Sequence, residues 1–137
     1  MDIFIGYDSS TVEAYVACTG SIRENAQDKK PTVHSLNHRQ LRHDNLLNRE
    51  WRIDEMGQYW DVEDGRPFST EFSFSRFCTI PLARRLGIED WVMFCDSDFI
   101  FQNDPAQLFK YCQDYPDKAL MTVQFDWQPE EGAVKMD

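Results

Sequence analysis

The chain has 137 residues, of which 42% are hydrophobic and 14% aromatic, a composition typical of one globular domain over residues 1–137. Its formal net charge of −10 would repel a polyanion, so nucleic acid is not an expected partner. No apolar run approaches the roughly 20 residues that span a bilayer, and Met1-Asp2 begins without a charged-then-apolar signal segment. We therefore expect a cytoplasmic protein with no transmembrane segment.

The four cysteines lie far apart and form no C-x-x-C pair. Cys18, Cys78 and Cys95 stand in apolar surroundings, whereas Cys112 does not. This distribution favours buried, reduced thiols over a disulfide framework or a zinc site.

The amino terminus predicts a β-α-β unit. Residues 3–5 are a short apolar run, typical of a strand buried on both faces, and the polar residues 7–10 follow it as a turn. Ser9, Ser10 or Thr11 could cap a helix in which apolar positions then recur at helical spacing. A second strand over residues 32–36 completes the unit.

Residues 37–66 carry a weaker signal. Polar residues dominate, with Trp51, Tyr59 and Trp60 between them, so we expect an irregular insertion with short helical pieces. A connection of this length is often functional. A solvated excursion anchored by its aromatic residues explains the same pattern equally well.

The rest of the chain continues the alternation of strands and helices. The expected elements are a helix over 69–87 with Pro81 in a first turn or at a kink, a strand over 91–95, a short helix over 104–109 and a strand over 118–125. Alternation of this kind predicts an α/β fold with a mainly parallel central sheet. Ligands gather at the carboxyl ends of such strands, where the polar segments 7–10 and 96–98 both fall.

The segment Asp96-Ser97-Asp98 is the strongest candidate for chemistry. Residues i and i+2 of an extended chain point the same way, so both carboxylates can face one point. Their mutual repulsion would be relieved by a hard divalent cation such as Mg²⁺ or Mn²⁺, which takes oxygen ligands. The alternative is an ordinary acidic turn in which Asp98 caps backbone amides. The apolar runs on both sides, WVMFC and FIF, favour a buried strand end and hence the metal site.

Three segments together resemble nucleotide-sugar-dependent glycosyltransferases of the GT-A fold, closest to family 8 and its bacterial and phage types. They are IFIGYDSS at the amino terminus, STEFSFSRF before the middle helix, and VMFCDSDFIF with its Asp-x-Asp. The resemblance implies a Rossmann-like nucleotide-binding sandwich and transfer of a sugar, from a UDP-sugar by analogy, to an unknown acceptor. It also implies Mn²⁺ or Mg²⁺ as cofactor.

The resemblance also assigns roles to residues. Asp96 and Asp98 would hold the metal against the donor diphosphate, with Asp96 and Ser97 also near the nucleotide sugar. Tyr7 would stack on the base and Asp8 would accept a base N–H, while the remaining donor-site residues would be Ser9, Ser10 and Arg76. Glu71 and Asp126 are further polar candidates near the site, and no catalytic acid, base or nucleophile is assigned.

The chain departs from the family in length, because relatives have a longer catalytic domain whose later half supplies more strands, acceptor contacts and often a histidine metal ligand. None of His34, His38 and His43 matches that ligand. We therefore expect a truncated or reduced donor-binding half, with an apolar edge that favours self-association. Two alternatives are a non-catalytic nucleotide-binding or assembly module and an aspartate-based phosphohydrolase. The hydrolase is disfavoured because Phe99-Ile100-Phe101 stands where a small hydroxyl residue is expected.

Overall fold

The computed structural model describes residues 1–27 and 29–124, which form two separate three-stranded sheets. The first sheet is parallel, with strand order β2-β1-β6, and consists of β1 (Asp2–Gly6), β2 (Thr32–Leu36) and β6 (Val92–Cys95). The three strands lie where the sequence predicts them. The α/β class and the parallel sheet are therefore confirmed.

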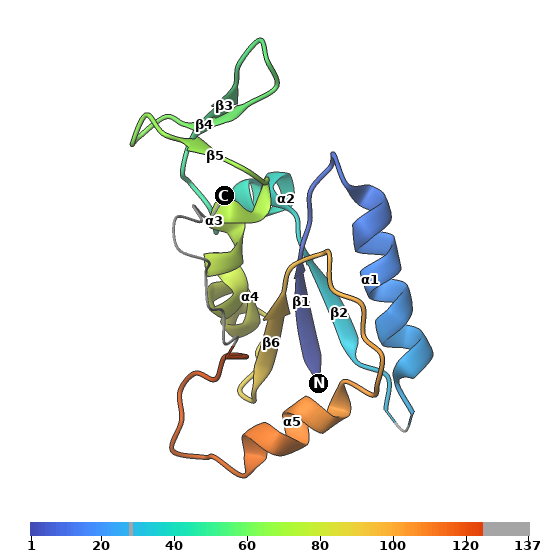
Figure 1. The fold of residues 1–137 in the computed structure, drawn as a ribbon. Helices are drawn as coiled ribbons and strands as arrows, with labels where there is room; N and C mark the ends of the chain where they lie inside the picture. The colour runs from blue at the N-terminus through green and yellow to red at the C-terminus, as the bar shows by residue number, and fades with distance from the viewer. Residues whose placement is uncertain (28, 125–137) are drawn as a thin grey trace, which may run out of the picture.

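The central strand β1 alternates its side chains between two hydrophobic clusters. Ile3 and Ile5 pack in one cluster with residues of α1 (Val12–Asn25) and with Phe109 of α5 (Ala106–Gln113). Phe4 points to the opposite face and joins a second cluster that includes Leu41 and Ala83. Since successive side chains of a strand point to opposite faces, one buried strand serves both cores. The sheet is thus covered by helices on both sides (Figure 1).

The helical segment after residue 69 differs in detail from its prediction. It is divided into α3 (Phe72–Ser75), a 3₁₀ turn η1 (Arg76–Cys78) and α4 (Thr79–Arg85), which ends before Gly87. Pro81 is the third residue of α4, so it occupies a first turn, where its missing N–H costs no hydrogen bond.

Helix α1 also differs from its prediction at the first turn. Thr11 occupies the N-cap position, but its side chain makes no capping hydrogen bond. Ser9 and Ser10, the other predicted caps, donate their hydroxyls to Glu71 and Asp8. Both serines precede the N-cap position, so their hydroxyls bind these carboxylates and do not cap the helix.

The segment 37–66 is more regular than predicted. It contains α2 (His38–His43), whose amino end is capped by the Asn37 side chain, and the strands β3 (Trp51–Ile53) and β4 (Tyr59–Asp61). Together with β5 (Pro67–Phe68) these strands form the antiparallel sheet, in the order β3-β4-β5. Strands of two or three residues are too short to display alternating hydrophobicity, which explains why the sequence pattern did not indicate them.

Arg49 stabilises the antiparallel sheet β3-β4-β5, which we call the small sheet. Its guanidinium pairs with buried Asp61 and with the exposed carboxylates of Glu63 and Asp64, and it lies 4.7 Å from the ring centre of Phe74. Phe74 belongs to α3, so this contact also attaches the small sheet to the helices beside the parallel sheet.

The predicted strand over 118–125 is wrong for the residues described. Residues 118–124 contain no strand, and Lys118 instead closes a turn by donating its amide to Tyr115. Leu120 and Val123 are 77% and 86% exposed, so the apolar residues that suggested a strand are not packed on the sheet. Phe125 and Asp126 lie outside the described residues.

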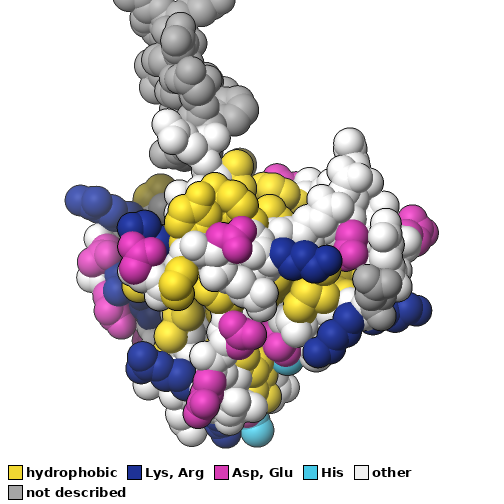
Figure 2. All heavy atoms as spheres, turned by 90° about the horizontal axis from the view of Figure 1, so that it is seen from below, with side chains coloured by type: hydrophobic (Ala, Val, Ile, Leu, Met, Phe, Trp, Pro, Cys, Tyr) yellow, Lys and Arg dark blue, Asp and Glu magenta, His cyan; other side chains and the backbone are white. Residues whose placement is uncertain are grey.

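Helix α5 crosses the end of the parallel sheet at which β1 begins, and it runs longer than the predicted 104–109 (Figure 1). Its Leu108 and Tyr111 are exposed. Figure 2 views the molecule from this side and shows hydrophobic side chains gathered in the middle of the face, with charged residues around them. The expected self-association stays a prediction. Within residues 1–27 and 29–124, no helix has the length and apolar character needed to cross a membrane.

Candidate functional site

The carboxyl ends of β1 and β6 meet at one edge of the parallel sheet. Ile5 is paired with Cys95 in the register of the two strands, so the segments that follow them start side by side. The loop after β1 carries residues 7–10, and the turn after β6 carries Asp96, Ser97 and Asp98. The two polar segments thus share one edge, as the sequence predicts.

Asp96 has an oxygen to which no described residue donates a hydrogen bond. Its Oδ1 atom is buried and accepts no hydrogen bond there, and the nearest cation is Nη2 of Arg76 at 3.8 Å. Ser97 is buried, whereas Asp98 is exposed. An acceptor oxygen shielded from water without a donor is costly, so this carboxylate is suited to receive a cation or a donor group from a ligand.

Arg76 is held at the edge of the sheet by α3 and η1. Its guanidinium carbon lies 5.4 Å from the ring centre of Phe72 and 5.7 Å from that of Phe94, and its Nε donates to the Phe72 carbonyl oxygen at 3.4 Å. The Arg76 side chain is still 37% exposed. A guanidinium that packs on aromatic rings and remains partly exposed to solvent can bind an anion.

The loop after β1 is fixed by Asp8, which is 2% exposed. Its Oδ1 accepts hydrogen bonds from the amide of Ser10 at 2.8 Å and from the hydroxyl of Ser10 at 2.6 Å. Its Oδ2 accepts the amide of Glu71 at 3.1 Å. Because a carboxylate oxygen can accept two hydrogen bonds, Oδ2 retains one direction for a further donor. Tyr7 is half-buried and packs edge-on against Tyr15, with ring centres 5.3 Å apart.

Glu71 joins the same cluster from the start of α3 and is 6% exposed. Its Oε1 and Oε2 accept hydrogen bonds from the hydroxyl of Ser9 at 2.7 Å and from the amide of Ser9 at 2.9 Å. The residue suggested only as a polar neighbour of the site is therefore in direct contact with the loop after β1.

Residues of segment 37–66 also lie near these carboxylates. Burial, followed by the negative charges of Glu71 and Asp8, raises the pKa of Tyr59. Burial, followed by the charge of Arg42, lowers the pKa of His38, and the Trp51 indole N–H donates to the His38 ring. Sequence reasoning assigned no role to Tyr59 or His38. The aromatic residues interspersed in this polar segment were the available signal.

Cys95 closes β6 directly before Asp96 and contacts the thiol of Cys18. The hydrogen bond between the two thiols, together with burial, raises the pKa of Cys95, and the same hydrogen bond lowers the pKa of Cys18. Cys18, Cys78 and Cys95 are buried free thiols, in agreement with the burial expected from their apolar surroundings.

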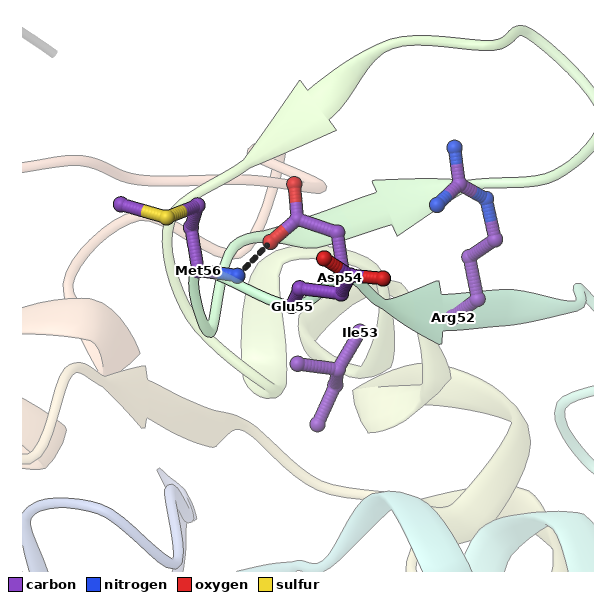
Figure 3. A pocket seen from close by; sticks show the side chains of 5 residues that line it. All are labelled: Arg52, Ile53, Asp54, Glu55 and Met56. Carbon is purple, nitrogen blue, oxygen red and sulfur yellow. Dashed lines mark hydrogen bonds between the residues drawn. The ribbon is translucent and has the colours of Figure 1, made fainter.

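The β3–β4 hairpin carries an open hollow lined by Arg52, Ile53, Asp54, Glu55 and Met56 (Figure 3). Asp54 accepts hydrogen bonds there from the amides of Met56 and Gln58 and from the Trp60 indole. These bonds shape the hairpin turn and occupy the carboxylate. We attribute the hollow to the turn and place the candidate site at the edge of the parallel sheet.

The residues at this edge offer the type of ligand atom that the expected Mg²⁺ or Mn²⁺ requires. The carboxylate of Asp96, whose buried Oδ1 accepts no hydrogen bond within the described residues, and the exposed carboxylate of Asp98 are hard oxygen ligands of the kind that Mg²⁺ and Mn²⁺ prefer. Over residues 1–27 and 29–124, no group of three or more His, Cys, Asp or Glu side chains is placed to hold a metal ion. The two aspartates would therefore share the ion with other ligands, such as phosphate oxygens or water.

These features define an α/β protein with an acidic pair and a supported arginine at the carboxyl edge of a parallel sheet. A curated protein of Arabidopsis thaliana called Protein CDI is similar to the chain, with 36% identity over 138 residues. The match covers 98% of this chain and 44% of that protein, so the chain spans less than half the length of its relative. No protein-family model and no solved structure matches the chain.

Proposed function

We propose that the chain is the donor-binding part of a metal-dependent glycosyltransferase of GT-A fold, which takes a nucleotide sugar such as a UDP-sugar. The observation that supports the proposal most strongly is the buried Oδ1 of Asp96, which accepts no hydrogen bond within the described residues and lies 3.8 Å from Arg76. The resemblance of the three sequence segments to family 8 enzymes supports the same function. The acceptor and the sugar are left open by the proposal.

In the proposed site, Asp96 and Asp98 hold the divalent cation from the carboxyl end of β6. The bound cation would neutralise charge that develops on the nucleoside diphosphate leaving group. Arg76 faces the same place and offers a planar guanidinium to phosphate oxygens. Together these groups would bind the diphosphate, orient it and stabilise its negative charge.

The loop after β1 would bind the nucleoside. Tyr7 presents a half-buried ring against which a base could stack, and Asp8 Oδ2 has one free acceptor direction for a base N–H. Ser9 and Ser10 are exposed and adjacent to these groups. We also propose a cytoplasmic location for the reaction.

Calorimetry with UDP-glucose and other nucleotide sugars, with and without Mn²⁺, tests the proposal. Metal-dependent binding that is lost in Asp98→Ala but kept in Asp114→Asn, a change at an exposed aspartate of the surface, supports it. A folded chain that binds no nucleotide sugar contradicts it. Sugar transfer in a turnover assay separates a catalytic unit from a binding module, and phosphate release from simple esters would indicate the hydrolase instead.

A further inference from the structure

Two segments that lie 62 residues apart in the chain are joined by hydrogen bonds at the candidate site. Ser9 donates both its amide and its hydroxyl to the carboxylate of Glu71, at 2.9 and 2.7 Å. In return, the amide of Glu71 donates to Asp8 Oδ2 at 3.1 Å. We call Asp8, Ser9 and Glu71 the clasp. It joins the loop after β1 to the start of α3 through hydrogen bonds in both directions.

The clasp places two carboxyl side chains out of water. Asp8 is 2% exposed and Glu71 6% exposed, and neither has a salt-bridge partner within the described parts of the chain. Burial of such groups is costly unless hydrogen bonds compensate for the lost water. Five hydrogen bonds do so here, two to Glu71 and three to Asp8. Such an arrangement holds its two segments in one geometry, since each bond has a narrow range of favourable distances.

The clasp lies close to Arg76 in the chain. Glu71 directly precedes α3, and Arg76 follows five residues later, at the start of η1. The intervening helical turns are short and are packed against the sheet, where the ring of Phe72 closes over Gly6. A shift of Glu71 would therefore be passed along this segment to the guanidinium that faces Asp96 at 3.8 Å.

We propose that Glu71 is a positioning residue of the donor site, which sets the loop after β1 and the guanidinium of Arg76 at a fixed separation. This inference rests on the proposed function, because the two groups so aligned are those that would bind the nucleoside and the diphosphate of one donor. Glu71 acts through Ser9 and Arg76 and does not itself contact the donor. It is the residue that makes two sequence-distant segments bind one ligand.

The clasp is strongest with a carboxylate at position 71. Both groups of Ser9 that face Glu71 are donors, and a carboxylate offers acceptors only. Glu71→Gln keeps the size of the side chain, but the Ser9 amide then meets a neutral oxygen and the Ser9 hydroxyl must rotate to accept from an N–H₂ group. The charge-assisted hydrogen bonds of the clasp thereby become weaker, neutral ones. The variant therefore loosens the loop with little change in packing.

The test combines four measurements on the full chain and its Glu71→Gln, Ser9→Ala and Arg76→Ala variants, with Glu89→Gln at an exposed position as the matched control. The first is affinity for Mn²⁺ alone, which we expect Glu71→Gln to leave within twofold because Asp96 and Asp98 belong to the turn after β6. The second is affinity for UDP-glucose with Mn²⁺, which we expect to fall about tenfold. The third is the same affinity in the Arg76→Ala background, where Glu71→Gln should have less than a threefold effect. The fourth is the hydrogen-exchange rate of the Ser9 amide proton, which should be higher in Glu71→Gln than in the unsubstituted chain.

Each outcome has one meaning. If Glu71→Gln folds but weakens Mn²⁺ and UDP-glucose binding alike, the positioning role is overturned. UDP-glucose binding that Glu71→Gln leaves within twofold, or an equal effect with and without Arg76, overturns it as well while sparing the proposed function. Absence of UDP-glucose binding by the unsubstituted chain overturns the proposed function and the positioning role together. If Glu71→Gln does not fold, Ser9→Ala removes one bond of the clasp from an exposed residue and must show the same pattern, at a smaller size.

Discussion

Removal of the Arg76 guanidinium should have opposite effects on the two ligands of the site. In the free protein Arg76 lies 3.8 Å from Asp96 and would compete with the proposed cation for the same oxygen. When the donor is bound, the guanidinium is expected to bind phosphate oxygens. Arg76→Ala should therefore strengthen binding of the metal alone and weaken binding of the donor.

The structure sets the size of the first effect. Two unit charges at this separation interact by about 1 kcal/mol in bulk water and by about 4 kcal/mol at an effective dielectric constant of about 20. Both side chains are more than a third exposed, at 37% and 36%, so solvent screening keeps the interaction near the lower limit. Measured exposed pairs contribute about 0.2–1 kcal/mol, which corresponds to metal binding about 1.5- to 5-fold tighter. For the nucleotide sugar, loss of a hydrogen bond between Arg76 and a charged phosphate should weaken binding by about 1.5–3 kcal/mol, or roughly 10- to 150-fold in affinity.

Mn²⁺ affinity can be measured by the water-proton relaxation of Mn²⁺ solutions, and UDP-glucose affinity by calorimetry at saturating Mn²⁺. Arg84→Ala is the matched control, because Arg84 is exposed on the neighbouring helix α4 and makes no ion pair within the described residues. Weaker binding of both ligands in Arg76→Ala would refute the reasoning. So would a donor affinity that does not change.

Two further predictions concern the frame of the site and its response to pH. Gly6→Ala would place a methyl group 2.5 Å from the Phe72 ring, so we expect a loss of about 1–3 kcal/mol in unfolding free energy. The control Gly20→Ala in α1 meets nothing within 4 Å and should be neutral or stabilising. Equal changes in unfolding free energy for the two variants, measured by urea titration, would contradict this prediction. Burial lowers the pKa of His38 below its ordinary value of 6.5, so the unfolded chain takes up a proton that the folded chain resists, and stability should fall as pH is lowered through 6.5. His38→Gln should flatten this dependence and His43→Gln, at an exposed residue, should not.

The parallel sheet was predictable because its strands are continuous apolar runs that end in turn residues. Residues 32–36 form a strand with the predicted bounds, and residues 3–5 and 91–95 differ from their strands only at the ends. The meeting of residues 7–10 with 96–98 followed from one rule, that parallel strands end at a common edge. Local pattern and fold logic were sufficient for this part of the molecule.

The clasp could not be predicted in the same way. The three residues Asp8, Ser9 and Glu71 satisfy one another across 62 positions, and neither periodicity nor spacing reports on such a contact. The same limit applies to Tyr59, which approaches the buried carboxylates only because three very short strands fold back on one another. Long-range hydrogen bonds between polar residues leave no repeating signal in the chain.

The most direct test of the account is a crystal structure of the chain with UDP-glucose and Mn²⁺, in which the anomalous signal locates the metal. We expect one Mn²⁺ bound by the carboxylates of Asp96 and Asp98, at oxygen distances of about 2.0–2.2 Å, with the diphosphate on its open side and Arg76 turned toward a phosphate. A nucleotide bound at another place, or a metal bound away from the two aspartates, would contradict the account.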